Sequence, residues 1–160
     1  MAKQSKLNSM RLLEQHDIPY EAIEFPETMR DAADIADVLG IPPYMVYKTL
    51  VVEPADRGKP LLALLAADST LDLKKLAAAA GHKKVSMAAH KDAERLTGLK
   101  VGGISALMLT HKNWPVFLDS PALELEHILV SAGQRGLDLR VPTSALIRII
   151  QAKVADISAS

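Results

Sequence analysis

The sequence contains no cysteine, which excludes disulfide bonds, a thiolate nucleophile and metal sites built on thiolates. Aromatic residues make up only 4% of the chain, so a stacking platform for single-stranded nucleic acid is not expected. The 19 basic and 19 acidic side chains cancel, so a nucleic acid would bind at one local patch. Because neither a transmembrane run nor a signal-peptide pattern is evident, we expect a cytoplasmic protein without a membrane partner.

The hydrophobic pattern predicts one α+β domain over residues 1–160, with a mixed or largely antiparallel sheet and an aliphatic core. Helical patterns cover residues 6–15, 31–39, 72–80, 90–97 and the segment after Pro142. Strand patterns cover residues 20–25, 45–52, 61–66, 85–87, 103–109, 116–119, 128–130 and 137–141. The turn signals between residues 45–52 and 61–66 predict an antiparallel hairpin.

Lys48 stands out because it interrupts this apolar and β-branched strand pattern. An ammonium group is costly to remove from water unless it has partners. The side chain either extends to solvent from an edge strand or holds its charge at the wall of a pocket. In the second case it would meet a phosphate or a polarised carbonyl.

Two loops contain residues that could bind a ligand or could be purely structural. Gly102-Gly103 allows a close approach of backbone N–H groups to an oxyanion, or simply forms a tight turn into a strand. The second loop contains Ser131, Arg135 and Asp138, which offer a hydroxyl to a ligand or form a loop ion pair.

The sequence lacks the motifs of several classes of functional site. Ser131 is not in the Gly-x-Ser-x-Gly setting of a nucleophile elbow, which argues against a serine hydrolase. The five histidines are scattered, so we expect no metal, and no cofactor motif is present. His82-Lys83-Lys84 is a small basic patch after a helix end, either simply solvated or in contact with a nucleic-acid backbone.

The order of these motifs closely resembles the YbaK family, free-standing relatives of the editing domain of bacterial prolyl-tRNA synthetases. The resemblance is carried by Val46-Tyr47-Lys48-Thr49, Leu71-Asp72-Leu73, Lys83-Lys84-Val85-Ser86-Met87, Gly98-Leu99-Lys100-Val101-Gly102-Gly103-Ile104-Ser105 and Ser131-Ala132-Gly133-Gln134-Arg135-Gly136-Leu137-Asp138. It implies a mixed, barrel-like sheet flanked by helices. It also implies a trans-editing aminoacyl-tRNA deacylase that hydrolyses mischarged tRNA(Pro), with cysteinyl-tRNA(Pro) the usual substrate.

The resemblance also implies roles for individual residues. The catalytic positions would be Lys48, Gly102 and Gly103. The substrate-binding positions would be Phe25, Met29, Thr49, Ile104, Ser105, Ser131 and Asp138. The chain departs from the family pattern in two places: Ser105 is followed by Ala106-Leu107-Met108 rather than Pro-Leu-Gly, and Ala132 replaces a glycine.

These assignments lead to a mechanism and to alternatives. Lys48 would act as a fixed charge, and the attacking group would be the thiol of a cysteinyl substrate or else water. Replacing Lys48 by Ala, or Gly102 or Gly103 by a bulky residue, should block turnover. The expected partners are the 3′ end of tRNA(Pro) and prolyl-tRNA synthetase. The alternatives are an alanyl- or seryl-tRNA deacylase, or a non-catalytic module that binds aminoacyl-tRNA or a synthetase.

Overall fold

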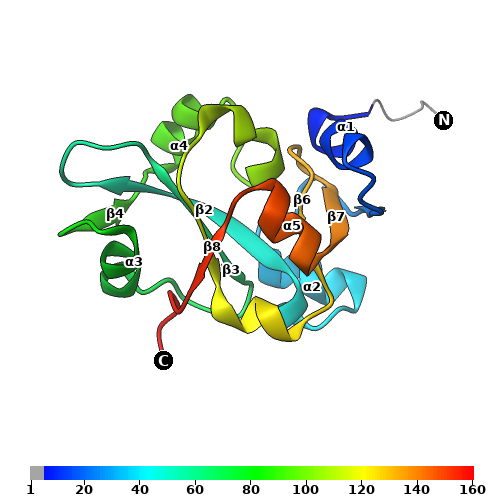
Figure 1. The fold of residues 1–160 in the computed structure, drawn as a ribbon. Helices are drawn as coiled ribbons and strands as arrows, with labels where there is room; N and C mark the ends of the chain where they lie inside the picture. Colours follow the sequence, from blue (N-terminus) through cyan, green and yellow to red (C-terminus); the bar gives the residue numbers. More distant parts are fainter. Residues whose placement is uncertain (1–5) are drawn as a thin grey trace.

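The computed structural model describes residues 6–160, which form two β-sheets flanked by short helices (Figure 1). The larger sheet has the strand order β4-β2-β3-β5-β8, with bounds Val85–Met87, Tyr47–Pro54, Leu61–Ala66, Val116–Asp119 and Lys153–Ala155. The smaller sheet has the order β1-β7-β6, with bounds Glu21–Glu24, Leu137–Pro142 and His127–Ser131. The predicted α+β class with mixed pairing is confirmed.

The predicted hairpin is also confirmed. Strands β2 and β3 pair antiparallel, with Lys48 opposite Leu65 and Val52 opposite Leu61. Strand β5 then pairs parallel with β3, and β8 pairs parallel with β5. Parallel neighbours need long crossover connections, and the intervening helices and the smaller sheet supply them. Strand β8 was not predicted, because three residues are too few to show a period of two.

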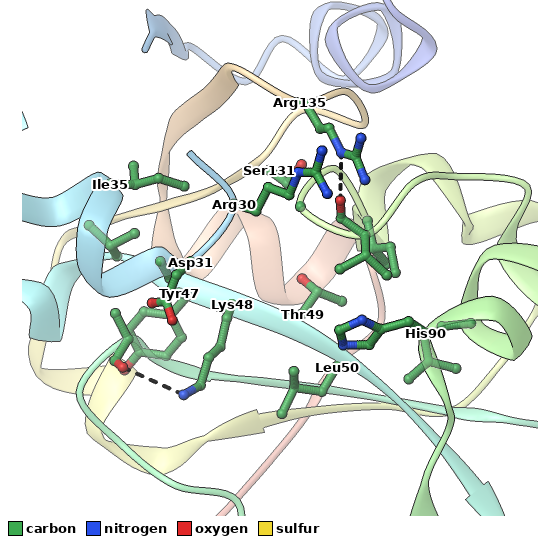
Figure 2. A pocket seen from close by; sticks show the side chains of 18 of the residues that line it. Arg30, Asp31, Ile35, Tyr47, Lys48, Thr49, Leu50, His90, Ser131 and Arg135 are labelled. Atoms are coloured by element: carbon green, nitrogen blue, oxygen red, sulfur yellow. Dashed lines mark hydrogen bonds between the residues drawn. The ribbon is translucent and has the colours of Figure 1, made fainter. Parts of the chain in front are cut away.

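The two sheets meet along β2. Strand β4 pairs with β2 only over residues 52–54, whereas Val46 forms a parallel bridge to Leu129 of β6. Between these contacts, no strand within residues 6–160 pairs with this edge of β2. Lys48 and Thr49 lie on the uncovered stretch (Figure 2). The seam between the sheets therefore leaves an opening lined by a strand.

The predicted helices all form. They are α1 (Asn8–Gln15), α2 (Ala32–Leu39), α3 (Leu73–Ala80), α4 (His90–Thr97) and α5 (Thr143–Ile149). Asp31 caps α2 by accepting a hydrogen bond from Ala33 N at 2.8 Å, and Gly40 ends it in the left-handed region at φ +66°. Asp72 caps α3 in the same way through Lys75 N at 3.0 Å. The capping residues that the sequence predicts therefore determine where these helices begin and end.

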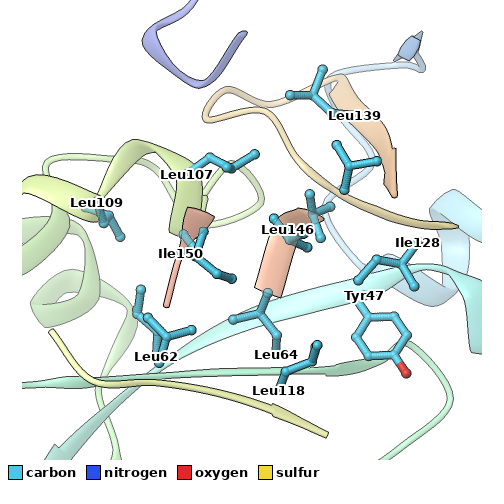
Figure 3. Packing of buried hydrophobic residues seen from close by; sticks show 14 of the residues in the cluster. Tyr47, Leu62, Leu64, Leu107, Leu109, Leu118, Ile128, Leu139, Leu146 and Ile150 are labelled. Carbon is cyan, nitrogen blue, oxygen red and sulfur yellow. The ribbon is translucent and has the colours of Figure 1, made fainter. Parts of the chain in front are cut away.

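The core lies between the larger sheet, β6, β7 and α5, and it is largely aliphatic, as predicted. Leu62, Leu64 and Leu118 of the larger sheet face Leu146 of α5 and Ile128 of β6 (Figure 3). Tyr47 packs at one end of this cluster. Across residues 6–160, no helix combines the length and the apolar character needed to cross a bilayer.

The strand predicted over residues 103–109 is wrong. The chain instead makes a loop that continues into two 3₁₀ helices, η2 (Ala106–Met108) and η3 (Thr110–Lys112). Two further 3₁₀ helices, η1 (Pro43–Met45) and η4 (Ser120–Glu124), precede β2 and β6. Leu107 and Leu109 are both buried, which gives the alternating apolar pattern of a strand. Here the two residues are buried because the 3₁₀ turns pack on α1 and α5.

Candidate active site

A pocket of about 800 Å³ opens at the seam between the two sheets. Its floor is the uncovered stretch of β2, and its walls come from α2, from β4 and α4, and from the glycine and serine loops. The lining consists of Arg30, Asp31, Ala32, Ala33, Ile35, Val46, Tyr47, Lys48, Thr49, Leu50, Val51, Ala67, Met87, Ala88, His90, Ala93, Glu94, Val101, Gly102, Ile104, Ser131, Arg135 and Asp138. Of the residues predicted for the site, Lys48, Thr49, Gly102, Ile104, Ser131 and Asp138 lie together here.

Lys48 is half-buried in the lining, with its ammonium group directed at the loop after β3 (Figure 2). The Nζ atom donates to Ser69 O at 2.6 Å and to Ala67 O at 3.5 Å. Among the described residues it forms no ion pair with a carboxylate. The charge is therefore held in place by carbonyl dipoles without being neutralised, which suits a group that meets an anion or a polarised carbonyl.

Thr49 offers a second polar group on the same stretch of β2, on the opposite face of the strand from Lys48. Its Oγ1 atom is buried and has no hydrogen-bond partner within residues 6–160. A buried hydroxyl without a partner is costly, so such an atom in a pocket wall is typical of a site that a ligand completes. Lys48 and Thr49 follow one another on the strand and both contribute to the lining.

The glycine loop uses its two glycines differently. Gly102 lines the pocket at φ +92°, and a Cβ there would lie 3.0 Å from the side chain of Arg30. Its N–H has no backbone acceptor in the described chain. Gly103 lies outside the lining, and its N–H already donates to Lys100 O at 2.8 Å. A Cβ on Gly103 would lie 2.7 Å from the carbonyl carbon of Gln134, so this glycine lets the serine loop pack closely.

Arg135 joins the glycine loop to the serine loop. Its Nε donates to Val101 O at 2.8 Å (Figure 2). Its guanidinium lies 3.9 Å from Glu94. Glu94 in turn accepts from Val101 N at 2.9 Å. The ion pair of Arg135 with Asp138, one of two alternatives from the sequence, is absent from the described residues, because Arg135 bonds across to α4 and its following loop instead.

The serine loop is supported from behind by α1. Ser131 Oγ accepts from Gly133 N at 3.2 Å, and Ser9 of α1 donates its hydroxyl to Ala132 O at 2.5 Å. Ala132 and Ala106 are buried outside the lining, and the half-buried Met108 also lies outside it, against Gly133 and Ser9. The positions that depart from the family pattern therefore contribute to packing beneath the pocket rather than to its surface.

Asp138 is the titratable group that the fold perturbs most within the pocket. Only 5% of the residue is exposed, and burial raises the pKa of its carboxyl from 3.8 to about 7. No hydrogen bond or ion pair of the described residues compensates the charged form. Near neutral pH this carboxyl can therefore exchange a proton inside the pocket.

The raised pKa of Asp138 predicts how stability depends on pH. Because the pKa is higher in the folded than in the unfolded state, the favourable contribution is complete below about pH 4 and is lost as the pH rises through 7. At about 1.4 kcal/mol per pKa unit, the loss is at most about 4 kcal/mol. Urea unfolding at pH 5, 7 and 8.5 should show Asp138→Asn gaining stability relative to the wild type as the pH rises. Parallel pH profiles for the two proteins would contradict this.

Four predicted site residues lie outside the lining: Phe25, Met29, Gly103 and Ser105. Phe25 is buried, and its N–H donates to Gly136 O at 3.0 Å, so it packs under the serine loop. Met29 is half-buried in the turn before α2. Ser105 is buried behind Ile104, and its hydroxyl has no partner among the described residues.

Sequence reasoning missed most of the walls formed by α2 and α4. Arg30 and Ile35 approach from one side, and Met87, His90 and Glu94 from the other. His90 was visible only as one of five dispersed histidines, and it begins α4 at the rim. No local signal marks these residues, because the pairing of distant strands brings them to the pocket.

Comparison with known proteins supports the family resemblance. The family model of the aminoacyl-tRNA editing domain matches residues 26–149. A curated relative from Enterococcus faecalis is 38% identical over 157 residues, covering 97% of this chain and 94% of its own length. That relative, EbsC, is named as a candidate Cys-tRNA(Pro)/Cys-tRNA(Cys) deacylase.

Solved structures share the fold. The crystal structure of a hypothetical protein covers 96% of this chain and 100% of its own, with a TM-score of 0.87 at 22% identity. A crystal structure described as a candidate trans-editing enzyme for prolyl-tRNA synthetase covers 98% of this chain and 100% of its own, with a TM-score of 0.81 at 22% identity. As its ordered motifs predict, the chain belongs to the aminoacyl-tRNA editing domain family, of the YbaK type, and its activity is that of an aminoacyl-tRNA deacylase.

Proposed function

We propose that the protein removes cysteine from mischarged tRNA(Pro) by hydrolysing the ester to the terminal adenosine. The observation that carries this proposal is the uncovered stretch of β2, which contributes to the seam pocket both Lys48, a half-buried cation held by backbone carbonyls, and Thr49, whose buried hydroxyl has no partner in the described chain. A scissile ester is a polarised carbonyl next to a phosphate-bearing strand, and both features suit a fixed positive charge. The name of the Enterococcus faecalis relative, which specifies cysteinyl-tRNA, supports the cysteinyl substrate.

In this mechanism the protein positions and polarises the ester but does not attack it. The ammonium of Lys48 binds the ester carbonyl or the neighbouring phosphate, and Thr49 Oγ1 donates a hydrogen bond to the aminoacyl group. The N–H of Gly102 is directed to the developing oxyanion, since the N–H of Gly103 is occupied by Lys100 O. Catalysis by such groups is electrostatic.

The attacking group comes from the substrate. The chain has no cysteine, and Ser131 Oγ accepts from Gly133 N without a histidine beside it among the hydrogen bonds of the described residues. The cysteinyl thiol attacks its own carbonyl, its proton passes to the departing 3′ oxygen, and water later opens the resulting thiolactone. Asp138, which exchanges a proton near pH 7, is suited to carry that proton.

We further propose that the whole chain, residues 1–160, acts as one editing domain in the cytoplasm, where charged tRNA is used. A net charge of zero provides little general attraction for tRNA. Prolyl-tRNA synthetase is therefore a candidate partner that would deliver the charged tRNA to the pocket.

A panel of charged tRNAs tests the proposal. Purified protein is mixed with cysteinyl-, alanyl- and seryl-tRNA(Pro), with and without prolyl-tRNA synthetase, and the released amino acid is measured. We expect cysteine to be released far faster than serine, because the serine hydroxyl is a weaker nucleophile than the thiol. Equal release of cysteine and serine would favour attack by water, and release of alanine alone would favour the alanyl-tRNA substrate. Binding of every charged tRNA without release would favour the non-catalytic module.

A further inference from the structure

The exposed charges around the pocket are divided between its two walls. On the side of α2, the segment that runs from β1 into this helix carries six exposed acidic residues, of which Asp31 lines the pocket: Glu21, Glu24, Glu27, Asp31, Asp34 and Asp37. Residues 21–40 contain one cation, Arg30, and no ion pair of the described chain involves any of these carboxylates. A polyanion is repelled from this wall.

The wall of β4 and α4 has the opposite character. Lys83, Lys84, Lys91 and Lys100 are exposed, and none of them forms an ion pair or a side-chain hydrogen bond within residues 6–160. The two carboxylates of α4 are already engaged, Asp92 with Arg95 at 3.3 Å and Glu94 with Val101 N at 2.9 Å. The positive charge of this wall is therefore available to a ligand.

The position of these lysines along the fold matters as much as their number. Figure 1 shows β4 and α4 near one end of β2 and α2 near the other. Met87 lines the pocket, while Lys84 lies three residues earlier in the chain, about 10 Å farther from the opening at 3.3 Å per residue. Lys91 follows the rim residue His90, and Lys100 precedes the pocket loop. The cations thus begin at the rim and continue outward.

Resting on the proposed function, we infer that the acceptor stem of the tRNA leaves the pocket across β4 and α4 and contacts Lys83, Lys84, Lys91 and Lys100. The net charge of zero does not reveal this surface, because it sums the acidic and basic residues of the whole chain. The division also orients the substrate, since a stem that crossed α2 would meet carboxylates instead of ammonium groups.

The test compares two variants that each remove four cations. In the first, Lys83, Lys84, Lys91 and Lys100 are changed to Ala. In the matched control, the exposed residues Arg11, Arg140, Arg148 and Lys153, which lie away from the pocket and in no ion pair of the described chain, are changed to Ala. Affinity for uncharged tRNA is measured between 50 and 300 mM salt, roughly the range over which phosphate contacts weaken.

Each phosphate contact contributes about 0.7 to 0.9 to the slope of log K against log salt concentration, so the lysine variant should lose about 3 from this slope. Its kcat/KM on charged tRNA should fall by about 10- to 100-fold, the size expected for a few lost phosphate contacts. Hydrolysis of an aminoacylated CCA trinucleotide, which ends before the stem, should change less than about twofold. An unchanged slope, or equal losses in both variants, would overturn the inference.

The proposed function fails in a different way. If the wild type binds tRNA but releases no amino acid from tRNA or trinucleotide, the editing activity is wrong, while the salt slopes still report on the surface. If the wild type hydrolyses both substrates and the lysine variant does the same, the activity stands and the docking surface is wrong. Absence of tRNA binding by the wild type overturns the surface directly.

Discussion

Lys48→Ala should lower kcat for deacylation by about 100-fold or more, the effect of removing one group that stabilises a developing oxyanion. The substitution removes the charge from the seam pocket, where no other ammonium group lies in the lining. The fold should survive, because the side chain donates only to Ser69 O and Ala67 O at a half-exposed position. The free energy of unfolding should change by about 1 kcal/mol, typical of one or two hydrogen bonds.

Lys59→Ala is the matched control for this change. Lys59 also donates its ammonium to a backbone carbonyl, Asn113 O at 3.3 Å, but it is outside the pocket lining. Single-turnover release of cysteine from charged tRNA and chemical unfolding are measured on both variants. A folded Lys48→Ala variant that turns over at the rate of the wild type would rule out the proposed role. A loss shared by Lys59→Ala would indicate a general effect of charge.

Gly103→Ala should lower kcat/KM by about 10- to 100-fold, although Gly103 does not line the pocket. The added Cβ would lie 2.7 Å from Gln134 C and 2.9 Å from Arg135 N. Both are backbone atoms, so the glycine and serine loops must separate by several tenths of an ångström or more. Displacements of about 1 Å in a positioning residue cost about 100-fold in rate. Overpacking of this kind also destabilises by about 1–3 kcal/mol.

Gly81→Ala separates the two consequences. Gly81 ends α3 at φ +78° with open space around it, so alanine strains the backbone without touching a neighbour. It should lose about 1 kcal/mol of stability and keep full activity. Steady-state kinetics at a temperature where both variants are folded provide the comparison. Unchanged kinetics of Gly103→Ala would show that the contact between the two loops does not determine the geometry of the site.

Local signals were sufficient to predict much of this fold. Asp31, Asp72, Gly40 and Gly81 mark the ends of helices through bonds within a few residues, and the structure has these caps. The order of motifs was sufficient for the family. The failures have a physical origin in distance along the chain. The apolar spacing of residues 103–109 looks like a strand, but the packing of Met108 against Gly133 and Ser9 belongs to elements far away in sequence.

The site residues differ in the same way: some could be predicted from local sequence, and others depend on contacts between distant segments. Lys48 and Thr49 are consecutive residues of one strand, so the sequence alone places both on the same stretch of β2, with their side chains on opposite faces. Arg30 and His90 reach the pocket only because α2 and α4 begin beside the uncovered stretch of β2. Gly103 was assigned to the ester because it is part of a glycine pair, yet its contacts are with Gln134 and Arg135. No pattern within ten residues contains that information.

The pocket belongs to neither sheet, and this has a consequence for how selectivity can change. Its width depends on how far apart the two sheets stand, and that spacing is set by a small buried cluster of Ala36, Val46 and Leu129, where α2, β2 and β6 meet. One additional methylene at Ala36 or Leu129, which lie outside the lining, should shift α2 against β6 without altering any lining residue. We therefore expect a substitution in this cluster to change which size of amino acid the pocket accepts while its walls stay the same.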